Sequence, residues 1–210
     1  AISTPVIGEK EETVYADEDV KPTDKPSTAG VYNDVKTTDW YYDAVVTLTE
    51  KGIVSGDGSG EFKPNDKVTR EQFVKMILEA LGIEAVKGEN NFTDVSENAW
   101  YVDYIITASE LGIVNGLAET HFGIGSNISR QDMAVIIERV LAYKEIEIEK
   151  AEVEAFADAS EVAGYAADAV ANMKAIGLIQ GYNNNYNPKD NLTRAEAATV
   201  ISSLLELLAK

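Results

Sequence analysis

Three arginines with the same neighbours are the residues best suited to chemistry in this sequence. Arg70, Arg130 and Arg194 each follow a threonine or serine and stand at the start of an apolar-periodic segment. A threonine or serine there is typical of a helix N-cap, so each arginine would lie where backbone N–H groups are unpaired and the helix dipole is positive. Such a place attracts anions, and a guanidinium beside it can bind a carboxylate through two parallel hydrogen bonds. The pattern predicts an anion site, with a structural salt bridge as the alternative for any one arginine.

Aromatic and acidic residues recur at fixed positions ahead of each arginine. The aromatic positions are Trp40, Trp100 and Tyr165, and the acidic positions are Asp34, Asp94 and Asp158. Each aromatic residue begins an apolar helical face, so we expect core packing, with stacking on a sugar ring as the alternative. Each aspartate stands in a turn before a helix, so we expect bonds from backbone N–H groups, with a sugar hydroxyl as the alternative partner. Both sets are therefore candidates for ligand binding beside the arginines.

The charge and composition of the chain exclude several classes of function. Its 36 acidic and 18 basic residues give a net charge of −18, which repels phosphate backbones, and no basic cluster offsets this charge. The absence of cysteine excludes thiol catalysis, disulfides and thiolate metal sites. The acidic segment 57–61 lacks the glycine and glutamate that an EF-hand requires downstream, and no apolar run is long enough to span a bilayer. We therefore expect no nucleic-acid binding, no membrane insertion, and neither a cofactor nor a metal.

These residues belong to a unit that occurs three times. The copies span residues 31–83, 91–144 and 155–208 and keep the same order of aromatic residues, aspartates, glycines and arginine. Such repetition indicates an architecture in which the units pack on one another. Residues 1–30 do not match the unit, and their prolines and acidic runs predict a tether or linker, with 13–16 as a candidate short strand. The charged residues 145–154 are interpreted as a continuation of the preceding helix or as a linker.

Each unit predicts two helices joined by a loop. In the first unit, one helix begins near Trp40 and ends at Gly52, and the second begins at the N-cap Thr69 and ends at Gly82. Capping boxes are predicted at Thr69–Gln72 and Thr193–Glu196, with a loose match at Ser129–Asp132. A lone pair of helices buries too little apolar surface to be stable. The units must therefore stack in line or close into a pseudo-threefold bundle, and periodicity leaves both arrangements open.

The landmarks resemble those of the S-layer homology domain, which usually occurs as three tandem copies in exported bacterial proteins. The matching motifs are aromatic-x-Asp-Val at 32–35 and 92–95, Gly-Ile-Val-x-Gly at 52–56 and 112–116, Phe-x-Pro at 62–64, and Thr-Arg-Ala-Glu at 193–196. The resemblance covers residues 31–208. It implies an all-α fold in which three helix-loop-helix repeats pack as a pseudo-trimeric spindle with a central three-helix bundle.

The same resemblance implies non-covalent anchoring outside the cell, at the bacterial cell surface or S-layer. The implied partner is a secondary cell wall polysaccharide, often one that carries a pyruvate ketal. Its binding sites would lie in grooves between repeats, with Arg70, Arg130 and Arg194 at their centres and the recurring aromatic residues and aspartates as further members. The chain departs from the family pattern at Tyr165, which replaces tryptophan, and at Ile124, where the other units have proline.

Two other functions stay open on the sequence. A glycoside hydrolase needs paired carboxylates as acid and base, and the chain is rich in acids. The recurring acids are explained by turns and caps, however, and no unit holds a unique reactive constellation, so we expect no enzymatic activity. The other alternative is a structural module whose units mediate the self-assembly of a surface layer.

Overall fold

The computed structural model describes residues 31–148 and 151–210, so the tether predicted at 1–30 and its candidate strand lie outside the described residues. Six α-helices and two short 3₁₀ helices form in this part of the chain. In chain order they are α1 (Tyr42–Glu50), α2 (Arg70–Leu81), α3 (Val102–Glu110), α4 (Arg130–Tyr143), η1 (Ala159–Glu161), η2 (Gly164–Ala166), α5 (Ala167–Ala175) and α6 (Arg194–Leu208). The described residues form no β-strand, and their extended segments pair only as isolated β-bridges, so the predicted all-α fold is confirmed. None of the described helices is long and apolar enough to cross a membrane.

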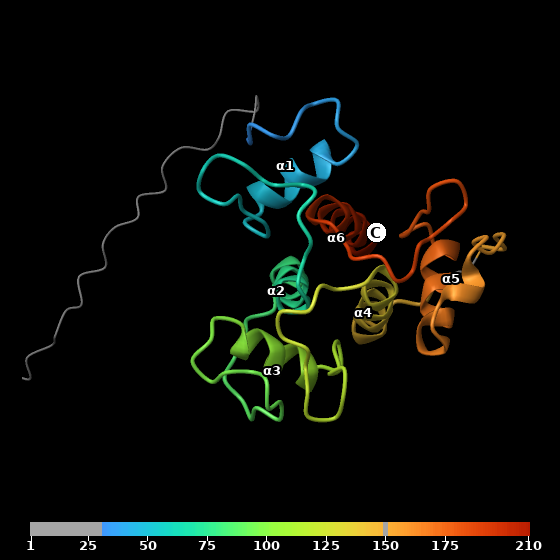
Figure 1. The fold of residues 1–210 in the computed structure, drawn as a ribbon. Coiled ribbons are helices and arrows are strands. Elements are labelled where there is room, and N and C mark those ends of the chain that lie inside the picture. Colours follow the sequence, from blue (N-terminus) through green and yellow to red (C-terminus); the bar gives the residue numbers. More distant parts are fainter. Residues whose placement is uncertain (1–30, 149–150) are drawn as a thin grey trace, which may run out of the picture.

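The three repeats close into a pseudo-threefold spindle. Helices α2, α4 and α6 lie together at the centre of Figure 1, and α1, α3 and α5 surround them in three lobes. Each outer helix packs on the central helix of the preceding repeat, with α3 on α2, α5 on α4 and α1 on α6. The contact between α1 and α6 joins the first repeat to the third and closes the circle. The structure therefore decides between the two arrangements that periodicity left open, and it confirms the implied spindle.

A ring of backbone hydrogen bonds joins the repeats where the central helices begin. The Val68 N–H donates to Leu192 O at 3.0 Å, the Leu192 N–H donates to Ile128 O at 2.9 Å, and the Ile128 N–H donates to Val68 O at 2.9 Å. All three residues are buried. Because buried backbone groups must be paired, the ring fixes the register of the repeats. Each member stands two residues before a recurring arginine, so the ring also fixes the point from which that arginine extends.

The central helices begin and end in ways that the local sequence largely predicts. Both predicted capping boxes are complete, at Thr69–Gln72 and Thr193–Glu196. Ser129 accepts a bond from the Asp132 N–H, while the Asp132 carboxylate accepts a bond from the Tyr165 hydroxyl at 2.6 Å. Helix α4 ends at Tyr143, and the described residues of 145–154 are not helical. Of the two interpretations of residues 145–154, the described residues therefore exclude a continued helix and agree with a linker.

The expectation that Trp40, Trp100 and Tyr165 pack in the core is wrong. Trp40 and Trp100 come before α1 and α3, and Tyr165 lies in η2, so none belongs to the apolar stripe of an α-helix. Their side chains are 67%, 55% and 66% exposed, respectively. Other aromatic residues fill the core instead, as seen at the fully buried Phe62, Phe122 and Tyr186. Trp40, Trp100 and Tyr165 are therefore surface residues that a ligand can reach.

Candidate functional site

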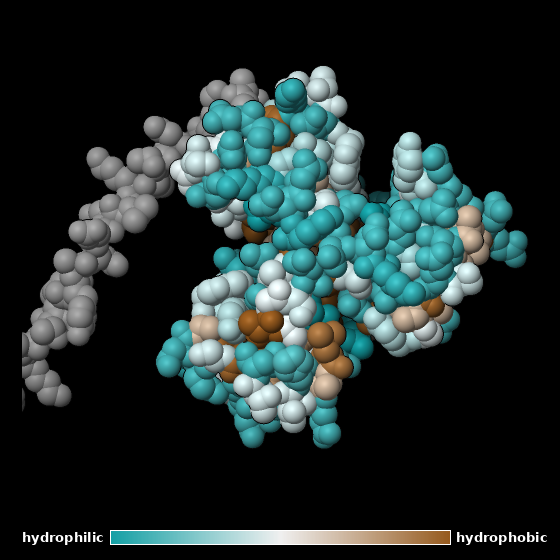
Figure 2. Space-filling view, viewed as in Figure 1, coloured by the Kyte–Doolittle hydropathy of each residue, from teal (hydrophilic) through white to brown (hydrophobic). Residues whose placement is uncertain are grey.

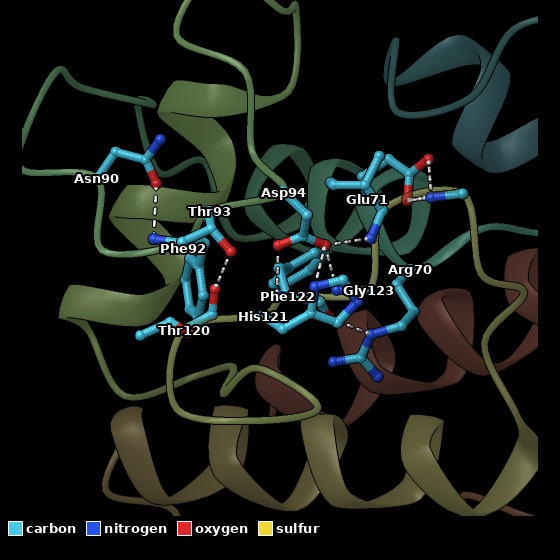
Figure 3. Close-up of polar contacts among 12 residues, drawn as sticks. Arg70, Glu71, Asn90, Phe92, Thr93, Asp94, Thr120, His121, Phe122 and Gly123 are labelled. Carbon is cyan, nitrogen blue, oxygen red and sulfur yellow. Dashed lines mark hydrogen bonds and ion pairs between the residues drawn. The ribbon is translucent and has the colours of Figure 1, made fainter.

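The recurring aspartates fasten the loop of each repeat. The carboxylate of Asp94 accepts bonds from the three consecutive backbone N–H groups of residues 122–124, at 2.7, 2.7 and 2.9 Å (Figure 3). Asp34 and Asp158 accept equivalent bonds from the loops of the first and third repeats. The expected backbone partners are therefore present, but they lie 28 to 30 residues ahead rather than in a local turn. The aspartates fix the loop that carries the buried aromatic residue.

The bonding of these aspartates leaves them little capacity for other chemistry. Burial of Asp94 and Asp158 opposes their ionisation, but the backbone N–H donors outweigh burial and lower the pKa of both carboxyl groups. They are therefore anionic at neutral pH and engaged within their own repeats. Among the described residues no group of three or more histidines, aspartates or glutamates could hold a metal ion.

Two of the three recurring arginines extend across a repeat boundary onto the neighbouring loop. Arg70 donates from Nε to Phe122 O at 3.1 Å (Figure 3), and its guanidinium carbon lies 5.0 Å from the centre of the Phe122 ring. Its Nη2 donates to Asn115 O at 3.0 Å. Arg194 makes the same set of contacts with the first repeat. Its Nε donates to Phe62 O and its Nη2 to Ser55 O, both at 2.8 Å, and the ring centre is 4.5 Å away.

The hydrogen-bond acceptors of these two guanidinium groups are neutral carbonyls, and Asp132 forms only a long ion pair with Arg70. Arg70 is only 6% exposed, and burial lowers its pKa, although the nearby carboxylate of Asp132 opposes this shift. Burial likewise lowers the pKa of Arg194. Arginine nevertheless stays protonated in proteins, so both side chains remain cations. The Asp132 carboxylate is 3.8 Å from Nη1 of Arg70, which is beyond hydrogen-bond distance. A buried cation of this kind attracts an anion strongly.

Arg130 has the same position in its repeat but a different partner. Its Nη1 is paired with Oε1 of Glu196, and its guanidinium carbon lies 5.3 Å from the centre of the Tyr186 ring. Its buried Nε has no hydrogen-bond partner among the described residues, whereas the Nε atoms of Arg70 and Arg194 donate to carbonyl oxygens. The charge of Arg130 is therefore balanced inside the protein, and the three arginines are not equivalent.

Each arginine lies in a groove at a repeat boundary, and two of these grooves draw on all three repeats. The Arg70 groove has a volume of about 330 Å³ and is also lined by Arg139 of α4 and Tyr165 of the third repeat. The Arg130 groove, of about 600 Å³, is lined by α6 and by Trp40 of the first repeat. Figure 2 shows a largely hydrophilic face on which hollows separate the three lobes. The structure thus places Tyr165 in the same groove as Arg70, and Trp40 in the same groove as Arg130.

The Arg194 groove has a volume of about 350 Å³, close to that of the Arg70 groove, and its lining holds more charged residues than the other two. Lys63 and Lys67 belong to its lining, and Trp100 does not. The Trp100 ring lies instead 6.0 Å from Nζ of Lys75 on α2, a cation–π contact. The linings of the three grooves also exclude the predicted aspartates Asp34, Asp94 and Asp158. Of the nine predicted site residues, the grooves therefore contain the three arginines, Trp40 and Tyr165.

Sequence reasoning missed the residues that face each arginine from the next repeat. These are the last residues of the arginine tetrads, Gln72, Asp132 and Glu196, which line the Arg194, Arg70 and Arg130 grooves. They were recognised only as helix caps. The sequence shows that these three residues differ in charge and length. It does not show which arginine lies opposite each one, because that arginine belongs to another repeat.

The spindle with a groove at each repeat boundary defines a closed module of three helical repeats. A model of the S-layer homology domain family matches residues 31–74, 91–134 and 155–198. The chain is 35% identical over 181 residues to an endoglucanase of Bacillus sp. (strain KSM-635), covering 85% of this chain and 19% of that protein. It is 34% identical over 185 residues to the surface-layer 125 kDa protein of Lysinibacillus sphaericus, covering 86% and 15%. It is also 34% identical over 180 residues to an amylopullulanase of Thermoanaerobacterium thermosulfurigenes, covering 83% and 9%.

The chain belongs to the S-layer homology domain family, because the three matched segments together make up more than half of its length. Membership confirms the resemblance drawn from the motifs and places the chain among the cell-wall attachment modules of the bacterial surface. The chain spans less than a fifth of the length of these relatives, which include enzymes as well as a surface-layer protein.

Proposed function

We propose that this chain attaches a larger protein non-covalently to the outside of the cell wall by binding a pyruvylated secondary cell wall polysaccharide in the grooves between repeats. The module itself is not an enzyme. One observation carries the proposal: the guanidinium groups of Arg70, which is buried, and Arg194, which is half-buried, reach across a repeat boundary and donate to neutral carbonyl oxygens at the edge of a groove. Such cations are prepared for an anionic ligand.

The geometry of these arginines suits a carboxylate. Both backbone carbonyls are bound by the Nε–Nη2 edge of the guanidinium. A guanidinium has five N–H donors, so three remain, and two of these, one on Nη1 and one on Nη2, lie parallel on the Nη1–Nη2 edge. A carboxylate accepts two parallel hydrogen bonds from such an edge. A pyruvate ketal places one carboxylate on a sugar ring, so this group fits the remaining donors of Arg70 and Arg194.

Tyr165 adds an aromatic wall to the Arg70 groove. Its hydroxyl donates to Oδ1 of Asp132 at 2.6 Å, and burial together with this bond raises the pKa of Tyr165 to about 12. The phenol is therefore neutral at physiological pH. The other oxygen of Asp132, Oδ2, forms an ion pair of 3.8 Å with Nη1 of Arg70, which is too long for a hydrogen bond. The exposed ring can stack on the apolar face of a sugar while the arginine binds the carboxylate.

The overall charge of −18 does not favour an anionic polymer at long range. Screening restricts this repulsion to roughly 8 Å at physiological ionic strength. Recognition of the polysaccharide then rests on the cations inside the grooves. Affinity that collapses in moderate salt would instead indicate diffuse attraction between opposite charges.

The proposal is tested by calorimetric titration with cell wall polysaccharide whose ketals are intact or have been removed. We expect ketal-dependent binding by the wild-type chain and its loss in the double variant Arg70→Ala, Arg194→Ala. The exposed Lys36 lies outside all three groove linings, so Lys36→Ala is a control for the loss of a positive charge. Equal binding of the ketal-free polymer, or undiminished binding by a folded double variant, would contradict the proposal.

The alternatives to anchoring have separate tests. A hydrolase would release fragments from purified wall glycan, and we expect no release, since Asp34, Asp94 and Asp158 are engaged by backbone N–H groups. Self-assembly into a surface layer is a second candidate, suggested by the surface-layer protein among the relatives. A chain that stays monomeric at high concentration in analytical ultracentrifugation would count against it.

A further inference from the structure

The three grooves differ at one position, the last residue of the arginine tetrad. In the closed circle this residue of each repeat shares a groove with the arginine of the preceding repeat: Gln72 lines the Arg194 groove, and Glu196 pairs with Arg130. Asp132 meets Arg70 in the third groove. The chain thus contains a natural series at one site, comprising a neutral residue, a short acid and a long acid. The length and charge of this residue decide whether the arginine is already occupied.

Glu196 is long enough to occupy the arginine opposite, and both of its oxygens are engaged. Its Oε2 accepts from the Thr193 N–H at 2.8 Å as part of the capping box, and its Oε1 is paired with Nη1 of Arg130. The guanidinium is drawn to this carboxylate, and its Nε remains without a partner in the described structure. A ligand carboxylate would therefore have to displace a carboxylate that the helix cap fixes in place.

The charges that line the grooves follow the same division. The Arg70 groove holds two arginines and one aspartate, and the Arg194 groove holds three cations and two aspartates, so each has a net charge of one positive. In the Arg130 groove the charged residues are Arg130 and Glu196, which balance each other. This groove therefore offers no net attraction to an anion.

The walls of the Arg130 groove suit an uncharged sugar. Trp40 and Tyr182 both belong to its lining, and they are 67% and 79% exposed. At the position of Tyr182 the other repeats have Asp57 and Leu117, so the second aromatic wall is specific to this groove. Side chains of α6 supply hydroxyl groups at Thr199 and Ser203. Aromatic faces beside a few polar groups are suited to a pyranose ring, and the volume of about 600 Å³ lies within the range of ligand pockets.

We propose that the Arg130 groove is selective for an uncharged sugar residue and excludes the carboxylate that the Arg70 and Arg194 grooves bind, with Glu196 as the specificity-determining residue. This inference rests on the proposed function, because it assigns an unmodified sugar of the same polysaccharide class to one of the three grooves. The anchor would then recognise both ketal-bearing and ketal-free sugar units.

The decisive variant is Glu196→Gln, which releases Arg130 without removing the helix cap. The first repeat shows that glutamine is compatible with the cap, since Gln72 forms a complete capping box with Thr69. The reciprocal variant Gln72→Glu places the long acid opposite Arg194. We expect Glu196→Gln to open the Arg130 groove to anions and Gln72→Glu to close the Arg194 groove. We expect both variants to keep their capping boxes, so a change in binding at an unchanged Tm reports on the groove and not on folding.

The probes are methyl glucopyranoside and the same glycoside carrying a 4,6-pyruvate ketal, followed by two-dimensional ¹H–¹⁵N NMR. The chain has two tryptophans, so the indole N–H signal of Trp40 reports on the Arg130 groove. In the wild-type chain we expect this signal to shift with the uncharged glycoside and to be at least tenfold less sensitive to the ketal. In Glu196→Gln we expect the ketal to shift it with an apparent Kd at least tenfold lower than in the wild type.

Each outcome separates the inference from the proposed function. Equal effects of the ketal on Trp40 in both proteins, or no effect of either probe on Trp40, overturn the inference even where the polysaccharide still binds through Arg70 and Arg194. If the wild-type chain shows no ketal-dependent binding of the polysaccharide, the proposed function is overturned. A shift of Trp40 with the uncharged glycoside alone would then still support the uncharged-sugar assignment.

Discussion

Replacing Arg194 by lysine tests whether the groove uses the shape of the guanidinium or only its charge. The present side chain makes two hydrogen bonds of 2.8 Å and lies 4.5 Å from the centre of the Phe62 ring. Lysine keeps the charge but is a point donor, so it can replace only part of this fork. Hydrogen bonds to a charged group are worth about 1.5–3 kcal/mol each. We therefore expect a loss of about 2 kcal/mol in the free energy of unfolding, which lowers Tm by about 4–8 °C in a chain of this size.

The same Arg194→Lys change should also weaken ligand binding at this groove. Losing one of two parallel bonds to a carboxylate weakens binding at this groove by about 1.5–3 kcal/mol, which is roughly 10- to 150-fold in Kd. The assay is calorimetric titration with the ketal-bearing polysaccharide in an Arg70→Ala background, so that the Arg194 groove is the anion site under study. Lys36→Arg, on the exposed surface, is the matched control. Unchanged affinity in Arg194→Lys would refute the bidentate geometry and leave only an electrostatic contribution.

Two further predictions concern stability. Asp94→Asn removes the charge that three backbone N–H groups stabilise, and we expect a loss of about 2–4 kcal/mol in the free energy of unfolding at pH 7, measured by urea denaturation. Because the folded-state pKa of Asp94 is lowered, its contribution is present above the unfolded pKa of about 3.9 and is lost as the pH falls through the folded value, so the variant should lose less stability on acidification than the wild type. Leu48→Ala empties a fully buried site on α1, which packs on α6, and should destabilise the chain by about 2–5 kcal/mol. Because α1 closes the circle, α6 should lose hydrogen-exchange protection with α1, and retained protection of α6 would argue against an interlocked spindle.

The features that the sequence predicted well depend on neighbours in the chain. The N-caps Thr69 and Thr193 bond to residues three positions on, and Gly82 ends α2 with a left-handed φ of 64°, as a glycine in that place predicts. The periodic apolar stripe of α2 likewise faces the core. Such signals are local, so a single sequence displays them.

The features that the sequence did not predict depend on contacts between repeats. Periodicity could not choose the closed spindle, because closure rests on α1 packing against α6 at the far end of the chain. The core role expected for Trp40 failed because this residue precedes the helix whose apolar stripe it was taken to begin. Glu196 was interpreted as a cap alone, since its second partner, Arg130, is 66 residues away in sequence. Repetition gives three equivalent positions, but the residue opposite each one comes from another copy.

The most direct measurement is a crystal structure of the chain with a saccharide that carries a pyruvate ketal. We expect the ketal carboxylate to accept hydrogen bonds from the Nη1–Nη2 edge of Arg70 or Arg194, with the Nε–Nη2 edge still donating to the two backbone carbonyls and the Arg130–Glu196 pair intact. A carboxylate bound at Arg130, or a saccharide seated on the outer surface of a lobe away from all three grooves, would contradict this account.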